Sequence, residues 1–326
     1  MSPRARVGLI VGALALLAAV VVVGAAVLSS DEIVRPAEVA PAGKAQEGAP
    51  RLALALGLVS EADAEVLRSA VEAYEAGRLE QAAGLFAESD SLEAKLGAAF
   101  AAWPGSLDRV EQLGALYPRS AMVQLHVGIA RFWAGRRGAV EAWREAQDVE
   151  PDTPYAVRAG DLLQPEFAPG LPILVSDARV PSRDTKNLSP AEQLEALRKE
   201  AQDGPLDARL LYGIALQGAG RPVSAREVYA AAAEAFPDEP EALVADAIGR
   251  YTKERPAEAF SRLGPLSRRF PESASVRFHL GLLLLWQGDV KPARRQLRLA
   301  EQAGPGSLLA RRASLYLDEL AQAGTG

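Results

Sequence analysis

The sequence predicts an all-α protein, in which helix pairs are stacked in series behind one membrane-spanning helix. Three observations lead to this fold class. Residues 206–306 repeat the same order of residue types at a step of 34 residues, and alanine, the strongest helix former, is abundant throughout the chain. An uncharged stretch near the N-terminus is long enough to cross a lipid bilayer.

The N-terminal stretch from residue 7 to residue 28 contains no charged side chain. As a helix it would be roughly 33 Å long, which spans the hydrocarbon core of a membrane. Arg4 and Arg6 precede it, while Asp31 and Glu32 follow it. Basic residues stay on the cytoplasmic side, so residues 1–6 are expected in the cytoplasm and the repeats outside it, in the periplasm or the extracellular space. The alternative interpretation is a cleaved secretory signal, which places the repeats on the same side.

Two features follow from the composition of this region. Gly8 and Gly12 form a small-xxx-small pair, which allows transmembrane helices to pack closely and predicts a weak homodimer; the alternative is that glycine is simply common in such helices. Residues 29–58 are rich in alanine, proline, glycine and charge, and predict a flexible tether. Within them the apolar residues from Leu52 onward could form the first packed segment.

Residues 59–163 predict further helix pairs whose repeat columns are degenerate. Gly97 and Gly128 stand where a first helix needs a small residue, and Trp143 stands where the second helix carries a large one. Pro118 and Pro151 mark the turns into the following units, because proline cannot continue a helix.

Residues 164–188 predict a proline-rich insertion or linker. Four prolines argue against a continuous helix, and the only apolar run, from Ile173 to Val175, either packs as an extended segment or merely anchors the loop. Ser189 and Pro190 have the pattern of a helix cap and first helical residue. The helix over 189–205 is expected to complete an interrupted repeat in one continuous solenoid. The alternative is two lobes joined by residues 164–188.

Residues 206–306 contain three clear copies of the repeat, and residues 307–326 contain an amphipathic helix that we expect to cap the array. Each copy carries a small residue in its first helix, then an alanine and a larger residue four positions later in its second helix, on one helix face. Each copy ends in a proline. The repeat-packing columns are Gly213, Ala247 and Gly281; Ala225, Ala259 and Ala293; Tyr229, Leu263 and Leu297; and Ala232, Leu266 and Ala300.

A 34-residue helix pair with these columns resembles the tetratricopeptide repeat family, most closely in the third copy. In the second copy Asp246 and Arg250 replace apolar residues of the family pattern, and their four-residue spacing allows them to pair. The resemblance implies a right-handed α-solenoid whose first helices line a concave groove for peptides or helices. The groove residues implied are Leu210, Ile214, Gln217, Val244, Ile248, Tyr251, Phe278, Leu282 and Leu285.

The sequence offers few groups for catalysis. It contains no cysteine, no phosphate-binding loop and no Gly-x-Ser-x-Gly motif. Its two histidines, His126 and His279, each stand two residues before the small glycine of a repeat, which places them far apart along a solenoid. We therefore expect no enzyme activity, no metal site and no cofactor. The net charge of −6 argues against nucleic-acid binding.

These features predict a membrane-anchored scaffold of the cell envelope that binds a protein partner in an apolar groove. A more specific alternative is an assembly factor for cytochrome c maturation or another step of envelope biogenesis, which rests on architecture alone. A different class of function is a small-ligand binder or enzyme that uses the insertion, for which the sequence offers Asp177, Arg179, Arg183 and Asp184.

Overall fold

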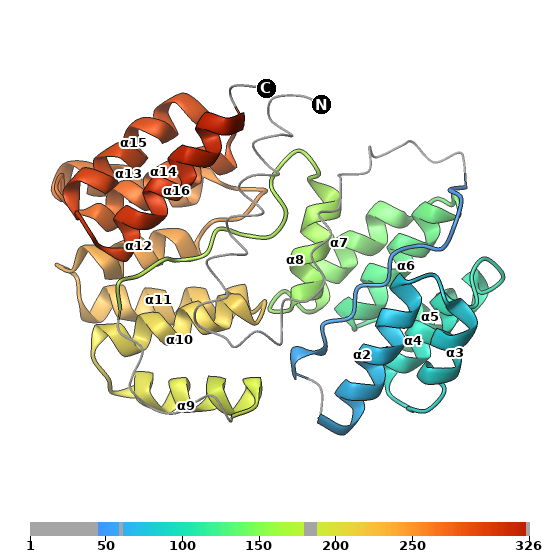
Figure 1. The fold of residues 1–326 in the computed structure, drawn as a ribbon. Coiled ribbons are helices and arrows are strands. Elements are labelled where there is room, and N and C mark those ends of the chain that lie inside the picture. The colour runs from blue at the N-terminus through green and yellow to red at the C-terminus, as the bar shows by residue number, and fades with distance from the viewer. Residues whose placement is uncertain (1–44, 59–60, 179–187, 324–326) are drawn as a thin grey trace. The chain divides into compact units, whose positions relative to one another are not determined.

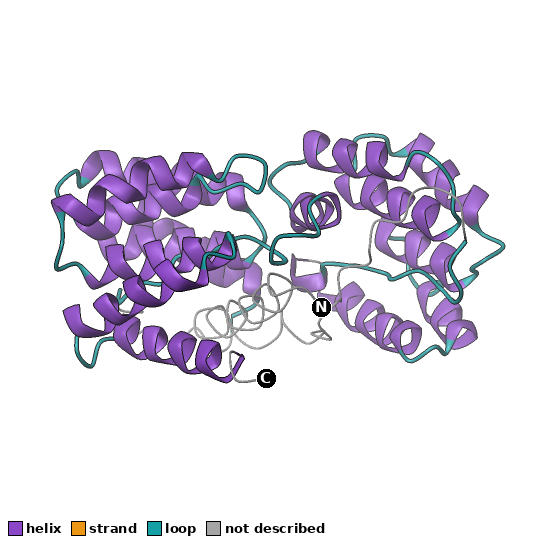
Figure 2. Ribbon diagram, turned by 90° about the horizontal axis from the view of Figure 1, so that it is seen from above, coloured by secondary structure: helices purple, strands orange, loops and turns teal. Residues whose placement is uncertain are grey.

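A computed structural model describes residues 45–58, 61–178 and 188–323. Within these ranges the protein is all-helical, with fifteen α-helices, one short 3-10 helix and no strand, as Figure 2 shows. The predicted membrane span and its Gly8–Gly12 pair lie outside the described residues. Among the helices that are described, none combines the length and the apolar character that crossing a bilayer would require.

The chain divides into two compact units, and the division falls between Leu163 and Gln164. This is the position at which the two-lobe alternative placed the joint. We refer to the described part of residues 45–163 as the N-terminal unit and to that of residues 164–323 as the C-terminal unit. Each unit has its own core of buried apolar side chains.

The N-terminal unit consists of three helix pairs and a final single helix (Figure 1). Each pair packs its two members together, and the last helix packs on both members of the third pair. A 3-10 helix, η1, precedes them at Leu56–Leu58. The helices are α2 (Glu61–Glu75), α3 (Leu79–Phe86), α4 (Leu92–Ala101), α5 (Leu107–Leu116), α6 (Ala121–Trp133), α7 (Ala139–Val149) and α8 (Pro154–Leu163).

The C-terminal unit repeats this arrangement and adds one helix in front. The added helix packs on the first member of the first pair, and the last helix covers the third pair. The helices are α9 (Pro190–Gln202), α10 (Leu206–Gly218), α11 (Pro222–Ala235), α12 (Pro240–Gly249), α13 (Ala257–Arg269), α14 (Ala274–Trp286), α15 (Val290–Ala303) and α16 (Leu308–Ala323).

Helix α9 begins as the sequence predicts. Ser189 caps it and Pro190 is its first residue, and Glu192 completes a reciprocal capping box with Ser189. The sequence analysis combined α8 and α9 into one interrupted repeat, but the two helices belong to different units. Helix α8 instead covers the pair α6–α7 in the way that α16 covers α14–α15.

The small residue of each first helix lies against the large residue of its second helix. A side chain at Gly213 would collide with the Tyr229 ring, and one at Gly281 would come within 2.9 Å of Leu297. Gly128 faces Trp143 in the same way. These glycines therefore set the close approach of the paired helices, and the other repeat-packing residues are buried.

The second repeat of the C-terminal unit tolerates a buried acid because the acid is paired. Asp246 is buried, and its two carboxylate oxygens lie 2.9 Å from Arg250 and 2.9 Å from Arg262. The pairing with Arg250 that the four-residue spacing allowed is confirmed. Two guanidinium groups thus compensate for the cost of removing this carboxylate from water.

The two units correspond helix by helix, from α2–α8 to α10–α16. The glycines that end α2 and α10, Gly77 and Gly220, both have positive φ, at 72° and 70°. Ser120 and Ser273 cap α6 and α14 in the same manner, each accepting a hydrogen bond from the backbone N–H three residues later. These shared positions identify which residues of one unit are equivalent to which residues of the other.

Candidate functional site

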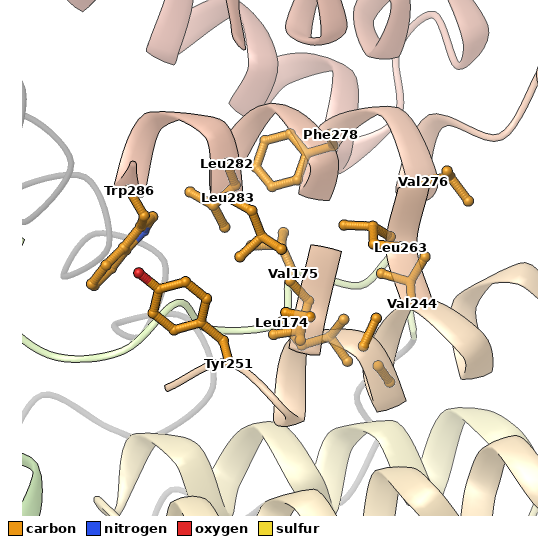
Figure 3. Close-up of a cluster of buried hydrophobic side chains, with 14 of the residues drawn as sticks. Leu174, Val175, Val244, Tyr251, Leu263, Val276, Phe278, Leu282, Leu283 and Trp286 are labelled. Carbon is orange, nitrogen blue, oxygen red and sulfur yellow. The ribbon is translucent and has the colours of Figure 1, made fainter. Parts of the chain in front are cut away.

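The first helices of the pairs, together with the last helix, form the inner face of each unit. In the C-terminal unit these are α10, α12, α14 and α16, and all nine predicted groove residues lie on the first three or directly after them. Eight of the nine are buried, among them Leu210, Val244 and Phe278, and Gln217 is half-buried. Figure 3 shows part of this cluster. The face is therefore covered within its own unit.

The cover is a segment that precedes the helices in the chain, from Gly170 to Asp177, which we call the C-terminal strap. It contains no helix or strand, and Figure 3 shows Leu174 and Val175 among the side chains of the inner face. Gln217 of α10 holds its main chain: the side-chain amide donates to the carbonyl oxygen of Pro172 at 3.2 Å, and the side-chain oxygen accepts from the Leu174 N–H at 3.0 Å.

His279 of α14 binds the next main-chain group of the strap. Its Nε2 accepts a hydrogen bond from the Val175 N–H at 3.0 Å, and its Nδ1 lies 2.7 Å from the carbonyl oxygen of Ser275. These two partners assign the proton to Nδ1 and leave Nε2 as an acceptor. The ring is fully buried, and this burial lowers the pKa of His279 from 6.5 to about 4.

The far end of the C-terminal strap is bound by two further side-chain contacts. The Ser176 hydroxyl donates to Glu241 at the start of α12 at 3.0 Å, and the Asp177 carboxylate accepts from the Leu308 N–H at the start of α16 at 2.9 Å. Burial raises the pKa of Glu241 above its ordinary value. The strap thus contacts all four helices of the inner face.

The N-terminal unit has a strap of its own, from Gly48 to Ala55. The Ala53 N–H donates to Nε2 of His126 at 3.1 Å, and Nδ1 of His126 lies 2.7 Å from the carbonyl oxygen of Met122. Burial lowers the pKa of His126 to about 4. The ring also meets the edge of Phe100, as His279 meets Phe278. Each histidine therefore performs the same structural task in its own unit.

Three more side chains hold the N-terminal strap. The Tyr74 hydroxyl of α2 donates to the carbonyl oxygen of Pro50. The Trp133 indole of α6 donates to the carbonyl oxygen of Gly48 at 3.1 Å, and the Tyr155 hydroxyl of α8 accepts from the Ala55 N–H at 3.1 Å. The sequence analysis assigned residues 48–55 to a flexible tether.

The two straps share a sequence pattern that the sequence analysis did not recognise. Each reads Gly-x-Pro-x-Leu, at residues 48–52 and 170–174. In both, the glycine has positive φ, at 81° and 78°, and the proline and leucine are buried. The donors to the proline carbonyl, Tyr74 and Gln217, occupy equivalent positions three residues before Gly77 and Gly220. The signals that could have revealed this were the repeated pattern and the equivalent places of the two histidines.

The two inner faces differ in one hydrogen bond. Trp286 ends α14 as Trp133 ends α6, and it is 3% exposed. Its indole N–H has no hydrogen-bond partner among the described residues, whereas that of Trp133 binds the strap. Figure 3 shows Trp286 beside Tyr251, whose pKa is raised to about 12 by burial. The inner face of the C-terminal unit therefore carries a donor that its strap does not use.

Two other regions were considered as sites. A cavity of about 610 Å³ on the N-terminal unit is lined by Leu107, Asp108, Glu111, Arg131, Arg136, Arg137, Gly138 and Glu141. Its acids and arginines balance in number, and Arg131 pairs with Glu111 at 3.2 Å, so it presents no net charge for an ionic ligand. Of the insertion residues proposed for a small-ligand site, Asp177 binds the strap to α16, and Arg179, Arg183 and Asp184 lie outside the described residues.

No group of three or more histidine and acidic side chains that could hold a metal ion occurs within the described ranges. No protein-family model matches the chain, and no curated protein matches it either. The chemistry of the site must therefore be read from its own geometry. Both inner faces present side chains that bind the main-chain N–H and C=O groups of a non-helical segment.

Proposed function

We propose that this protein is a helical-repeat scaffold that holds an extended segment of a partner protein on the inner face of its C-terminal unit. The observation that carries the proposal is the pair Gln217 and His279. These two side chains bind three consecutive polar main-chain groups of a segment that has no regular structure of its own. Main-chain groups are common to all peptides, so another segment can make the same bonds.

The geometry favours an extended ligand over a helical one. In a helix the N–H and C=O groups are bonded within the helix, so they are not free for Gln217 and His279. The strap presents Pro172 and Leu174 to the face at alternate positions, which is the side-chain period of an extended chain. The partner that we propose therefore contributes an extended apolar segment.

In the wild-type chain the strap occupies the face, so a partner must compete with it. A segment tethered by a short linker acts at an effective concentration on the order of millimolar. Weakening the strap should therefore reveal binding that the intact strap masks. Leu174 is the strap side chain most deeply buried, at 2% exposed, and Leu174→Asp is the change that weakens it most.

The test uses the full chain in detergent and a fluorescent peptide with the strap sequence of residues 170–177. We expect Leu174→Asp to bind this peptide at least about tenfold more tightly than the wild type, by the tethering argument. Leu116→Asp, the same change at a side chain that is 72% exposed, should behave as the wild type does. Absence of binding to Leu174→Asp, and to the milder Leu174→Ala, in chains with wild-type helix content would refute the proposal.

We further propose that residues 7–28 anchor the scaffold in the cytoplasmic membrane, with the repeats on the outer side. The support is the length of this uncharged stretch and the basic residues before it. Alkaline extraction of membranes from cells that express the full chain should leave the protein in the pellet, at its full mass. Release at a mass reduced by the N-terminal segment would instead support a cleaved signal.

A further inference from the structure

The two straps present the same three residue types at the same three structural positions. Between these positions the sequences differ: Ala49 and Arg51 in the N-terminal strap correspond to Leu171 and Ile173 in the C-terminal one. The bonding groups on the inner face correspond as well, because Tyr74 is equivalent to Gln217 and His126 to His279. Agreement in what is bound, with divergence in what is not, indicates which features the face recognises.

Each shared position has a physical reason. The glycine adopts positive φ in both straps, a conformation that other residues reach only with strain, and no neighbouring atom crowds it. The proline is buried, and its carbonyl oxygen accepts from Tyr74 or Gln217. Proline has no N–H, so no buried donor remains unpaired at that position.

The leucine and the residue after it complete the recognition. Leu52 and Leu174 are buried, at 8% and 2% exposed. The N–H of the following residue, Ala53 or Val175, donates to the buried histidine. A ligand therefore needs any residue except proline after the leucine. The position before the leucine is exposed at Arg51 and half-buried at Ile173, so its side chain is weakly constrained.

We propose that the inner face of the N-terminal unit is a second peptide-binding site, and that both units recognise an extended Gly-Xaa-Pro-Xaa-Leu segment of a partner protein. This inference rests on the proposed function of the C-terminal unit. It extends that function to Tyr74, His126, Trp133 and Tyr155, and it names the sequence class of the ligand. The straps are the internal copies of that ligand, one for each face.

The N-terminal site exchanges its strap more readily than the C-terminal one does. Its strap buries Leu52 and follows it with the small residue Ala53, whereas the C-terminal strap buries both Leu174 and Val175. Less apolar surface is therefore lost from contact when the N-terminal strap leaves. A ligand of the same pattern should occupy the N-terminal face of the wild-type chain first.

The experiment measures binding of one fluorescent peptide, with the sequence of residues 170–177, to two opened chains. Leu52→Asp opens the N-terminal face and Leu174→Asp opens the C-terminal face, with Leu116→Asp as the exposed control. We expect both opened chains to bind. In each, a peptide with the two Xaa residues replaced by Ala and Arg should bind within about threefold of the parent, whereas replacing its leucine by Asp should weaken binding by more than about tenfold.

The outcomes separate this inference from the proposed function. Binding to Leu174→Asp but not to a folded Leu52→Asp or Leu52→Ala would overturn the second site and leave the first intact. Absence of binding to either opened chain would overturn both. Binding that ignores the leucine or depends on the Xaa residues would overturn the recognition pattern. Adding Tyr74→Phe to Leu52→Asp, which deletes only the hydroxyl donor, should weaken binding at the N-terminal face and leave helix content unchanged.

Discussion

The amide of Val175 donates its hydrogen bond to the imidazole of His279 across 104 positions of the chain. Because His279 is fully buried, its Nε2 has no access to water, and leaving that acceptor unpaired would cost about 1–3 kcal/mol. The helices of the inner face therefore require a segment that supplies an N–H at this point. His126 imposes the same requirement on Ala53. Each face is built to be occupied, by its own strap or by another segment.

The close contact between Gly213 and Tyr229 leads to a first prediction. Gly213→Ala should destabilise the C-terminal unit by about 2 kcal/mol, because the added methyl group would collide with a fully buried ring on the paired helix. The free energy of unfolding in urea, followed by circular dichroism, measures the effect.

The matched control for this change is Gly264→Ala in α13. A side chain at Gly264 would meet no atom within 4 Å. The alanine should therefore stabilise the helix by about 0.5–1 kcal/mol through its higher helix propensity. Equal effects of the two substitutions would show that the packing of Gly213 against Tyr229 does not limit the approach of α10 and α11.

The helix pairs were accessible from sequence because the contacts that define them are local. The small residue at Gly213 and the large one at Tyr229 lie within one 34-residue repeat, and the step recurs, so the pattern reports the packing directly. The cap at Ser189 was accessible for the same reason, since its bonds reach only to Glu192. Local chemistry of this kind leaves a recognisable signature in one sequence.

The straps were not accessible by the same reasoning. Their contacts span 73 positions from Ala53 to His126 and 104 from Val175 to His279, and no period connects such residues. Proline and glycine in Gly48–Pro50 and Gly170–Pro172 are also typical of unpacked loops. The predicted groove residues were placed on the inner helices, but the sequence did not indicate that the chain covers them itself.

The unequal bonding of Trp133 and Trp286 leads to a second prediction. Replacing either indole by benzothienylalanine, which keeps the ring shape and lacks the N–H, isolates the hydrogen bond from the packing. At Trp133 the change should cost about 1 kcal/mol, because the bond to the Gly48 carbonyl is lost. At Trp286 it should cost nothing or stabilise slightly, because a buried donor without a partner is removed. Urea unfolding of the two chains provides the comparison, and a loss at Trp286 equal to that at Trp133 would contradict it.

The buried histidines lead to a third prediction, on pH. Burial lowers the pKa of His126 and His279 from 6.5 to about 4, so the unfolded chain binds more protons than the native one between these values. The stability of each unit is complete above pH 6.5 and falls as the pH decreases toward 4, by about 3 kcal/mol for a shift of this size. Urea unfolding measured from pH 7.5 to pH 4 should show this loss in the wild type. The His126→Gln/His279→Gln chain should be less stable at pH 7.5 and should lack that part of the slope, which separates the histidines from the surface carboxylates that titrate in both chains. Parallel pH profiles for the two chains would mean that neither imidazole is kept neutral by the strap and the core.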